Sequence, residues 1–356
     1  MMTMDLGGRE IRRILVRTTN WVGDTLLSTP ALAVLKENFP QAQVTVLAKS
    51  WVAPVLAGHP AVDEVFIFDR EGRHKGWAGL WRLAQELKQK RFDLAVLFQN
   101  AFQAALMTWL ARVPLRLGYN TDGRGLLLNR SVRLEPEDKK VHQTEYYLRL
   151  LRRAGLKTAK TRPVFYLSAE DEARAAARLD SLGLSGSFML GLAPGAAYGP
   201  AKQWPPERFA ASAEIILRDR NGAALLFGSR GEASVTGRVA ECLKAPVFDL
   251  AGQTGLAEAA ALIKQCCLFL TNDSGLMHVA AAVSIPLVAI FGSTNPATTS
   301  PAAEHFRIIR HQVECAPCLK QICDQDSHLC MEAVTPEEVA SAGLELLGEK
   351  GEEKNA

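Results

Sequence analysis

The chain has 356 residues, of which 48% are hydrophobic and 22% charged, and its formal net charge is +3. This composition is typical of a soluble globular protein and excludes a low-complexity chain, and we expect no nucleic-acid partner. Because one domain usually holds about 100 to 200 residues, the length predicts two domains.

The N-terminus and the cysteines indicate the cellular compartment of the protein. The N-terminus "MMTMDLGGREIRRILV" has no apolar core ahead of a cleavage site, so we expect no signal peptide and a cytoplasmic protein. Seven cysteines, with Cys266 and Cys267 adjacent in an apolar run, fit reduced thiols. Residues 274–296 lack Asp, Glu, Lys and Arg, but Pro286 interrupts them, which predicts a helix and then a strand rather than a membrane span.

Short runs of Val, Ile, Leu and Phe alternate with amphipathic stretches, a pattern typical of parallel sheets covered by helices. In the first half the predicted strands are 13–18, 43–48, 64–69 and 93–98, with helices near 25–38, 77–90 and 101–111. In the second half the predicted strands are 188–194, 223–228, 246–251, 267–272 and 286–292, with helices near 206–219, 232–243, 256–266 and 275–284. Two such series predict two doubly wound α/β domains.

The boundary between the domains is expected within 157–171, after a helix that contains "TEYYLRLLRRAG", and we place the domains at 1–165 and 166–356. A last helix is predicted near 335–349, with Thr335 as N-cap and Pro336 as first residue. We expect this helix to pack back on the N-terminal domain.

Charge is concentrated in one segment. Residues 101–160 hold twelve Lys or Arg against five Asp or Glu, a local excess of seven positive charges. Such an excess indicates an acidic partner, or a solvated helical face without one.

The stretch "TNDSGLMHVAAA" places polar residues between a predicted strand and a helix, where open α/β sheets bind ligands. Asp273 or Ser274 can cap the helix, Gly275 lets a ligand approach the backbone, and the amides with the helix dipole attract an anion. His278 lies on the same helix face. The alternative is a well-capped helix with a satisfied histidine.

A turn of the same type, "VRTTNWVGDTLLSTPAL", joins a strand ending near Thr18 to a helix starting near Thr25. Gly23 permits a tight loop, and Asp24 is positioned to cap the helix. A carboxylate at this place can instead act as a general base.

Two further strand ends carry polar loops. In "APGAAYGPAKQWPPERF", a long connection, Lys202 can hold a phosphate as a point charge. In "LLFGSRGEAS", Gly228 ends a strand, and Glu232 can accept hydrogen bonds from ribose hydroxyls or simply begin a helix.

The segment "CAPCLKQICDQDSHLC" has spacings that a zinc site can use, with reduced thiols as the alternative. Its candidate ligands are Cys315, Cys318, Cys323, His328 and Cys330. The signatures of P-loop NTPases, serine hydrolases and zincins are missing from the chain.

Four motifs in this order, "NWVGDTLLSTPAL", "PGAAYGPAKQWP", "FGSRGE" and "NDSGLMHVAAA", together resemble the ADP-heptose:lipopolysaccharide heptosyltransferases of glycosyltransferase family 9. "NWVGD" and "GPAKQWP" are most similar to type II members, and the similarity spans nearly the whole chain. The resemblance implies a GT-B fold of two Rossmann-like domains facing a cleft, with the donor on the C-terminal domain and the acceptor on the N-terminal one. It implies inverting transfer of L-glycero-D-manno-heptose to heptosyl-Kdo2-lipid A, a step of the lipopolysaccharide inner core in Gram-negative bacteria.

The resemblance also assigns roles by position. Asp24 would deprotonate the acceptor hydroxyl, Lys202 would bind the pyrophosphate, and Glu232 would bind the ribose. The further donor contacts would be Gly23, Ala196, Ala197, Gly228, Asp273, Ser274, Gly275 and His278. Type I members have paired Thr where this chain has the two alanines, so backbone amides would contact phosphate there. Arg124 and His142 would contact the acceptor.

No cofactor or metal is implied, since ADP-heptose is the donor substrate. The other partners would be the lipid-linked acceptor and, transiently, the inner leaflet, where the basic segment would hold the enzyme. The alternatives are a type I or type III heptosyltransferase step, another nucleotide sugar on the same fold, an epimerase of similar architecture, and a non-catalytic nucleotide-binding protein.

Overall fold

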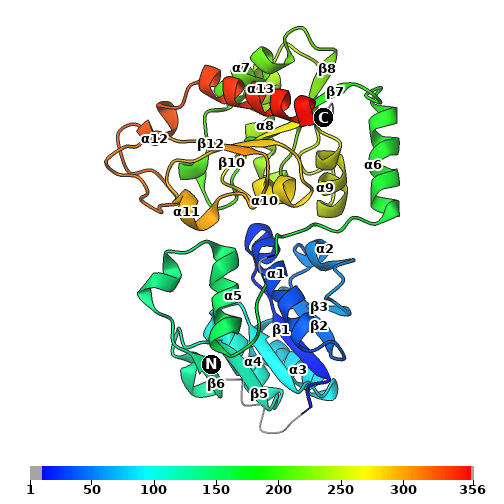
Figure 1. Cartoon of the computed structure of the whole chain (residues 1–356), viewed down its shortest axis with the longest axis vertical. Coiled ribbons are helices and arrows are strands. Elements are labelled where there is room, and N and C mark those ends of the chain that lie inside the picture. Colours follow the sequence, from blue (N-terminus) through cyan, green and yellow to red (C-terminus); the bar gives the residue numbers. More distant parts are fainter. Residues whose placement is uncertain (1–9, 160, 354–356) are drawn as a thin grey trace. The chain divides into compact units, whose positions relative to one another are not determined.

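The computed structural model describes residues 10–159 and 161–353. By internal packing the chain divides into two units, Met1–Tyr166 and Leu167–Ala356, one residue later than the boundary predicted from the sequence. Figure 1 labels most of the helices and strands of both units. In the described part of the chain, no helix combines the length and the apolarity needed to cross a bilayer.

The first unit is built on a six-stranded parallel sheet in the order β3-β2-β1-β4-β5-β6. Its strands are β1 (Arg13–Arg17), β2 (Gln43–Ala48), β3 (Glu64–Ile67), β4 (Leu94–Leu97), β5 (Leu115–Tyr119) and β6 (Arg130–Val132). Its helices are α1 (Val22–Asn38), α2 (Ala53–Leu56), α3 (Gly76–Gln89), α4 (Phe102–Leu110) and α5 (Gln143–Arg153), with 3-10 turns η1 (Arg124–Leu127) and η2 (Pro136–Lys139).

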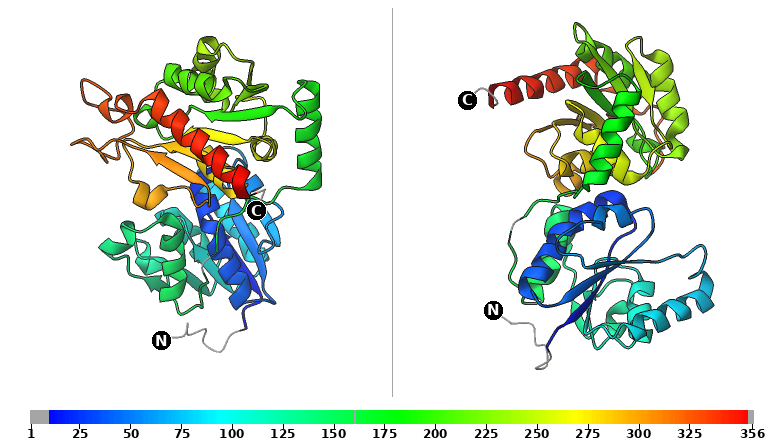
Figure 2. Two further views of the ribbon diagram at one scale, coloured as in Figure 1. Left: turned by 45° about the horizontal axis from the view of Figure 1, so that its top comes forward. Right: turned by 90° about the vertical axis from the view of Figure 1, so that its right-hand side faces the viewer.

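The strand order reverses between β1 and β4, because the chain returns from the edge strand β3 to the middle of the sheet. Right-handed crossovers then put the helices of the two halves on opposite faces. Helix α1 packs against α5, and α3 packs against α4. The right panel of Figure 2 shows α1 (dark blue) and α5 (green) on one side of this sheet and α3 and α4 (cyan) on the other.

The second unit repeats this plan with the order β12-β11-β10-β7-β8-β9. Its strands are β7 (Phe188–Ala193), β8 (Gly222–Leu226), β9 (Val247–Asp249), β10 (Leu268–Asn272), β11 (Leu287–Ile290) and β12 (Phe306–Ile309). Its helices are α6 (Ala169–Ser181), α7 (Pro206–Leu217), α8 (Ala233–Cys242), α9 (Leu256–Lys264), α10 (Gly275–Ala282), α11 (Pro296–Thr299), α12 (Leu329–Glu332) and α13 (Pro336–Glu353), with 3-10 turns η3 (Pro200–Lys202) and η4 (Arg230–Glu232).

The last helix belongs to the second unit. Helix α13 packs against α7 and against strands β10, β11 and β12, and its Val339 and Leu346 are fully buried in the core of that unit. The contacts given for this helix are with the second unit, and its predicted packing on the N-terminal domain stays a prediction. Trp204 is fully buried in the same core, stacked edge to face on Phe209.

The nine predicted strands are present, and the structure adds β5, β6 and β12. These three lack a continuous apolar run: β5 carries Arg116 in "LRLGY", β6 is only three residues long, and the edge strand β12 is half-buried throughout. Short or edge strands of this kind give little periodic signal. The helix and strand predicted on either side of Ser284 and Pro286 are both found, as α10 and β11.

Candidate functional site

The first unit has a pocket at its switch point. A cavity of about 420 Å³ opens where the loops after β1 and β4 meet, which is the position where open α/β sheets bind ligands. The lining is mixed polar and aromatic, with elements η2 and α5 opposite the two loops. The lining residues are Thr19, Asn20, Trp21, Asp24, Phe98, Gln99, Asn100, Leu134, Asp138, Lys139, Val141, Gln143, Tyr146 and Tyr147.

Asp24 is a wall residue of this pocket and not the helix cap that its position predicted. Helix α1 begins at Val22 with Trp21 as N-cap, so Gly23 and Asp24 lie inside the first turn. The carboxylate is half-buried and close enough to Tyr147 for its charge to act on that phenol. Burial first, and the charge of Asp24 second, hold the pKa of Tyr147 well above its usual value, so this phenol stays protonated.

Arg124 is in the core and offers no surface to a ligand. Its side chain is fully buried, and its guanidinium donates to the backbone carbonyls of Tyr119 and Gln99 and to Asn100 Oδ1 at 2.9 Å. Burial lowers its pKa to about 10. Arg124 therefore positions the β4 loop that lines the pocket, which corrects the expectation that it contacts the acceptor directly. His142 is the N-cap of α5, where its Nδ1 accepts from Thr144 N at 3.3 Å.

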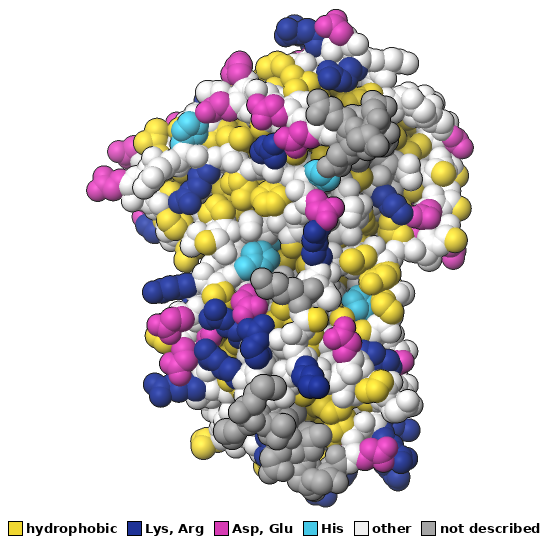
Figure 3. Space-filling view, viewed as in Figure 1, with side chains coloured by type: hydrophobic (Ala, Val, Ile, Leu, Met, Phe, Trp, Pro, Cys, Tyr) yellow, Lys and Arg dark blue, Asp and Glu magenta, His cyan; other side chains and the backbone are white. Residues whose placement is uncertain are grey.

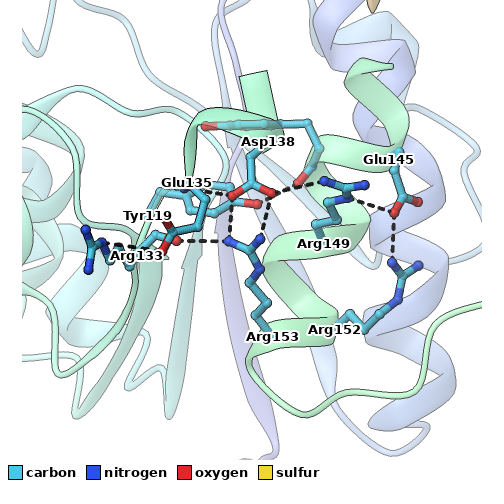
Figure 4. A network of polar contacts seen from close by, with 9 residues as sticks. Tyr119, Arg133, Glu135, Asp138, Glu145, Arg149, Arg152 and Arg153 are labelled. Carbon is cyan, nitrogen blue, oxygen red and sulfur yellow. Dashed lines mark hydrogen bonds and ion pairs between the residues drawn. The ribbon is translucent and has the colours of Figure 1, made fainter. Parts of the chain in front are cut away.

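Part of the basic segment 101–160 forms an ion-pair network within the unit. The carboxylate of Asp138 is completely buried and accepts from Arg149 and Arg153, and Glu145 pairs with Arg149 and Arg152, as Figure 4 shows. On the side of the first unit drawn in Figure 3, Lys and Arg side chains lie among Asp and Glu side chains. This network of three arginines and two carboxylates carries a net charge of only +1, so most of the excess of seven charges lies outside it.

In the second unit, Lys202 and Asp273 meet at the other switch point. Lys202 follows β7 and Asp273 follows β10, and these neighbouring strands mark where the strand order reverses. The Lys202 ammonium donates to Asp273 Oδ2 at 2.6 Å and lies 4.9 Å from the ring centre of Tyr198. The two side chains are only 13% and 4% exposed. Asp273 also accepts from the Thr294 hydroxyl at 2.7 Å, so it fixes the direction of Lys202.

The N-terminus of α10 is capped as predicted. Ser274 is the N-cap and accepts from Met277 N at 3.4 Å, and Gly275 is the first helical residue. Both are half-buried, whereas His278 is 6% exposed. The start of α10 therefore presents backbone amides and the positive end of a helix dipole beside Lys202 and Asp273.

Glu232 lies against the loop that follows β7. Its Oε2 accepts from the amide and the hydroxyl of Ser229, both at 2.7 Å, in a capping box. A Cβ on Gly195 would come within 2.2 Å of its Oε1, so the two groups are in close approach. Gly228 and Glu232 are also neighbours, since a Cβ on Gly228 would lie 3.3 Å from that of Glu232. The turns after β7 and β8 thus adjoin, with Ala196 buried and Ala197 exposed.

The four C-terminal cysteines face one small cavity of about 120 Å³ together with His328. Among the residues described, no three His, Cys, Asp or Glu side chains are placed to hold a metal ion. His328 Nε2 is instead 3.1 Å from the carbonyl of Ala201. None of the seven cysteines, all within the described chain, forms a disulfide in the structure.

The fold and the two switch-point sites define a class of protein. The family model described as glycosyltransferase family 9 (heptosyltransferase) matches residues 80–328, more than half of the chain. The chain therefore belongs to glycosyltransferase family 9 and is a glycosyltransferase, and its two Rossmann-like units are those of the GT-B fold.

Within this family, the chain is similar to particular heptosyltransferases over most of its length. The chain is 32% identical to lipopolysaccharide heptosyltransferase 2 of Salmonella typhimurium over 95% of its own length and 99% of the relative's. It is 34% identical to the Escherichia coli protein of the same name, over 84% and 88%. The solved structure of E. coli ADP-heptose LPS heptosyltransferase II superposes with a TM-score of 0.80 at 30% identity, covering 95% and 99% of the two chains. A family 9 glycosyltransferase from Veillonella parvula gives 0.84 at 26%, covering 96% and 99%.

Several pocket residues were missed from the sequence. Asn100 follows β4 and donates to the Tyr146 hydroxyl at 2.7 Å, and Asn20 accepts from buried Arg17 at 2.7 Å. The residues after β4, "FQN", could have been found as the second strand end of the same switch point. Tyr146 and Asp138 come from distant elements and carry no such signal. Thr294, the partner of Asp273, likewise follows the strand next to β10.

Proposed function

We propose that this enzyme transfers L-glycero-D-manno-heptose from ADP-heptose to the first heptose of heptosyl-Kdo2-lipid A, with inversion at the anomeric carbon. The observation that carries the proposal is the pair of switch-point sites, a carboxylate in one unit and a lysine beside a helix N-terminus in the other, in a chain 32–34% identical to heptosyltransferase 2 proteins.

The second unit supplies the donor site. Lys202, held by Asp273, and the amides at the start of α10 offer positive charge to a diphosphate, which gains negative charge as the sugar leaves. Glu232, beside Gly195 and Gly228, is placed for hydroxyls of the adenosine ribose, and Ala196 and Ala197 offer only backbone to the phosphates.

The first unit supplies the acceptor site. The pocket that contains Asp24 has room for a sugar ring and offers stacking surfaces from Trp21 and Phe98. Asp24 takes the proton of the attacking hydroxyl as the new glycosidic bond forms and the bond to the diphosphate breaks. Lys139 is the cation of this lining and is suited to an anionic group of the acceptor.

The proposal includes no cofactor, because Lys202 and the α10 dipole can stabilise the leaving group. It places the enzyme in the cytoplasm, with peripheral contact to the membrane that holds its lipid-linked acceptor. Full turnover in the presence of EDTA would support the first statement, and a strict requirement for added Mg²⁺ or Mn²⁺ would contradict it.

The deciding experiment measures transfer from ADP-heptose to two acceptors in parallel, heptosyl-Kdo2-lipid A and Kdo2-lipid A without heptose. We expect product from the first acceptor alone. Product from the second alone would assign the type I step, and product from neither, or transfer from a UDP-sugar instead, would overturn the proposal.

A further inference from the structure

One face of the first unit exposes an unusual number of large apolar side chains. Five of them, between 45% and 96% exposed, lie on α3, α4 and the adjoining η1, and we call this set the aromatic face. Its members are Trp77, Trp81, Phe102, Trp109 and Leu126. Helix α4 packs against both α3 and η1, so the set is carried by one continuous layer, the cyan layer in the right panel of Figure 2.

Helix α4 is apolar on both sides. Its sequence "FQAALMTWL" contains no charged residue. Ala104, Ala105 and Met107 are buried against the sheet, while Phe102 and Trp109, seven residues apart, share the outer side with half-buried Leu106. A surface helix normally has a polar outer side, so one that exposes Phe102 and Trp109 and carries no charge is expected to be covered by something other than water.

Helix α3 contributes tryptophans in the same way. Trp77 and Trp81 are one turn apart and therefore share a side of α3, at 80% and 56% exposure. The buried side of α3 is the separate stripe of Leu80, Leu83 and Leu87. The tryptophans are thus additional to the core, and Trp is the side chain enriched where proteins enter the interface between lipid and water.

The surrounding charge is positive. Residues 70–112 hold eight Lys or Arg against three Asp or Glu. Seven of these cations are exposed, and Lys90 is half-buried and paired with Glu64. Of the seven, Arg73 pairs with Glu86, and within the described chain none of the other six forms an ion pair: Arg70, Lys75, Arg82, Lys88, Arg91 and Arg112. Of the three carboxylates, Glu86 is paired with Arg73 and Asp93 accepts the backbone amides of Arg12 and Arg13. Unpaired cations around exposed tryptophans complement an anionic bilayer surface.

We propose that the aromatic face docks the enzyme on an anionic lipid bilayer, with the tryptophans in the headgroup region and the cations of α3 and of the residues that flank α3 and α4 on lipid phosphates. This inference rests on the proposed function in one respect: the purpose of docking would be to bring the acceptor site to a lipid-linked sugar. It places the membrane contact on α3 and α4, and not on the ion-paired network of η2 and α5.

The first test is co-sedimentation of the whole protein with vesicles. We expect binding to vesicles of phosphatidylcholine mixed with phosphatidylglycerol, little binding to pure phosphatidylcholine, and loss of binding as salt rises, since exposed charges are screened. Blue-shifted tryptophan emission and its quenching by brominated lipid should accompany binding. Equal binding to both vesicle types, or none to either, would overturn the proposal.

Variants locate the surface. The pair Trp77→Ser and Trp81→Ser should weaken partitioning roughly tenfold or more, because interfacial binding scales with the apolar area buried. The control Ile322→Ser removes a side chain of similar exposure, 70%, from the second unit and should have no effect. Lys88→Glu should weaken binding by roughly fivefold or more, given the attraction of each cation to the leaflet, whereas Lys244→Glu, the same charge change on the second unit, should not.

The last arm separates this inference from the proposed function. The Trp77→Ser and Trp81→Ser variant should keep wild-type transfer to an acceptor whose acyl chains have been removed, and lose transfer only to the acceptor in vesicles. If the wild type shows no transfer to either acceptor, the proposed function fails while the vesicle results still decide the docking surface. If these variants instead dissociate a dimer without changing vesicle binding, a second copy of the chain covers the face and the bilayer proposal is wrong.

Discussion

Asp24 illustrates how one residue can satisfy a local rule and still serve a different role. A carboxylate in the first turn of a helix is favoured by the helix dipole, so its presence alone needs no functional reason. The cap position is occupied by Trp21, which provides no side-chain hydrogen bond, and Asp24 faces a cavity instead. Its surroundings, with Tyr147 kept protonated beside it, suit a group that collects a proton.

Replacing Asp24 with Asn tests this role. We expect turnover to fall by about 10² to 10⁴, the usual contribution of a general base, with ADP affinity nearly unchanged. The measurement is kcat at saturating donor and acceptor, with ADP binding by calorimetry as the control. Near-normal turnover in Asp24→Asn would show that another group takes the proton.

Lys202 and Asp273 form a buried ion pair, and its contribution to fold stability can be separated from the contribution of Lys202 to turnover. Lys202→Met should lower turnover by about 10² to 10³, as loss of one group that stabilises developing charge does. It should also destabilise the fold by about 3 to 5 kcal/mol, because it leaves the Asp273 carboxylate buried without its cation. Adding Asp273→Asn should restore the melting temperature but not turnover. If the double variant regains turnover, Lys202 serves only to neutralise the Asp273 carboxylate, and its role in stabilising the leaving group is wrong.

At the scale of elements, the network on η2 and α5 holds one wall of the pocket in the first unit. Burial raises the pKa of Asp138, but hydrogen bonds from the Glu135 amide and from Arg149 and the charge of Arg153 outweigh it, so the pKa lies below its ordinary 3.8. A carboxyl with a lowered folded-state pKa stabilises the fold above its unfolded-state value. That stability is lost as pH falls through the lower, folded-state value.

Asp138→Asn should therefore cost about 1.5 to 3 kcal/mol at neutral pH, as loss of hydrogen bonds to a charged group does. Its stability should also depend less on pH below about 4 than that of the wild type. Urea midpoints measured from pH 7 downward check both statements. Asp324→Asn, in an exposed ion pair with Lys320, is the matched control and should change stability little. Parallel pH curves for wild type and Asp138→Asn would contradict the assignment.

The turns after β7 and β8 are held together by a close approach at Gly195. Gly195→Ala would push a methyl group into the Glu232 carboxylate, so we expect Glu232 to move and ADP affinity to fall roughly 10- to 100-fold, as for lost hydrogen bonds to a charged group. Gly237→Ala, on α8 with open space around its Cβ, is the control and should bind ADP normally. Unchanged affinity in Gly195→Ala would remove Glu232 from the donor site.

Elements also show how far the sequence can be interpreted. The sequence predicts β1, β7, β8 and β10 and the polar groups that follow them. The signal is an apolar run followed within a few residues by Gly, Asp or Ser, and it can be found because it is local in the sequence. The partners of those groups are not local: Tyr146 on α5 reaches Asn100, and Thr294 reaches Asp273. Arginine is a residue type that often contacts anionic ligands, so the sequence favours Arg124 as a ligand contact. Only the packing of β4 and β5 around it shows that it is buried.

At the scale of the whole molecule, two sheets of the same topology each place their polar loops at the reversal of strand order. In the proposed mechanism this duplication assigns the two sites to different substrates, because the base acts on the acceptor and the cation acts on the diphosphate that leaves the donor. The first unit has Asp24 and an open pocket, whereas the second has Lys202 and the start of α10. The division implies that each substrate can bind to its own unit without the other.

Hydrogen exchange with ADP tests this division in the whole chain. A ligand at 100 times its Kd stabilises its site by about 2.7 kcal/mol, which slows exchange of the amides it orders by up to roughly 100-fold. We expect ADP alone to protect residues 194–202, 228–232 and 272–278 while leaving 18–24 and 98–100 exchanging as before. The Lys202→Met variant should lose most of this protection, and Asp24→Asn should keep it. Among the residues described, the switch point of the second sheet is the place where that unit offers both a lysine and a helix N-terminus to a diphosphate. Protection centred instead on the loops after β1 and β4 would therefore place the nucleotide in the first unit and reverse the assignment of donor and acceptor.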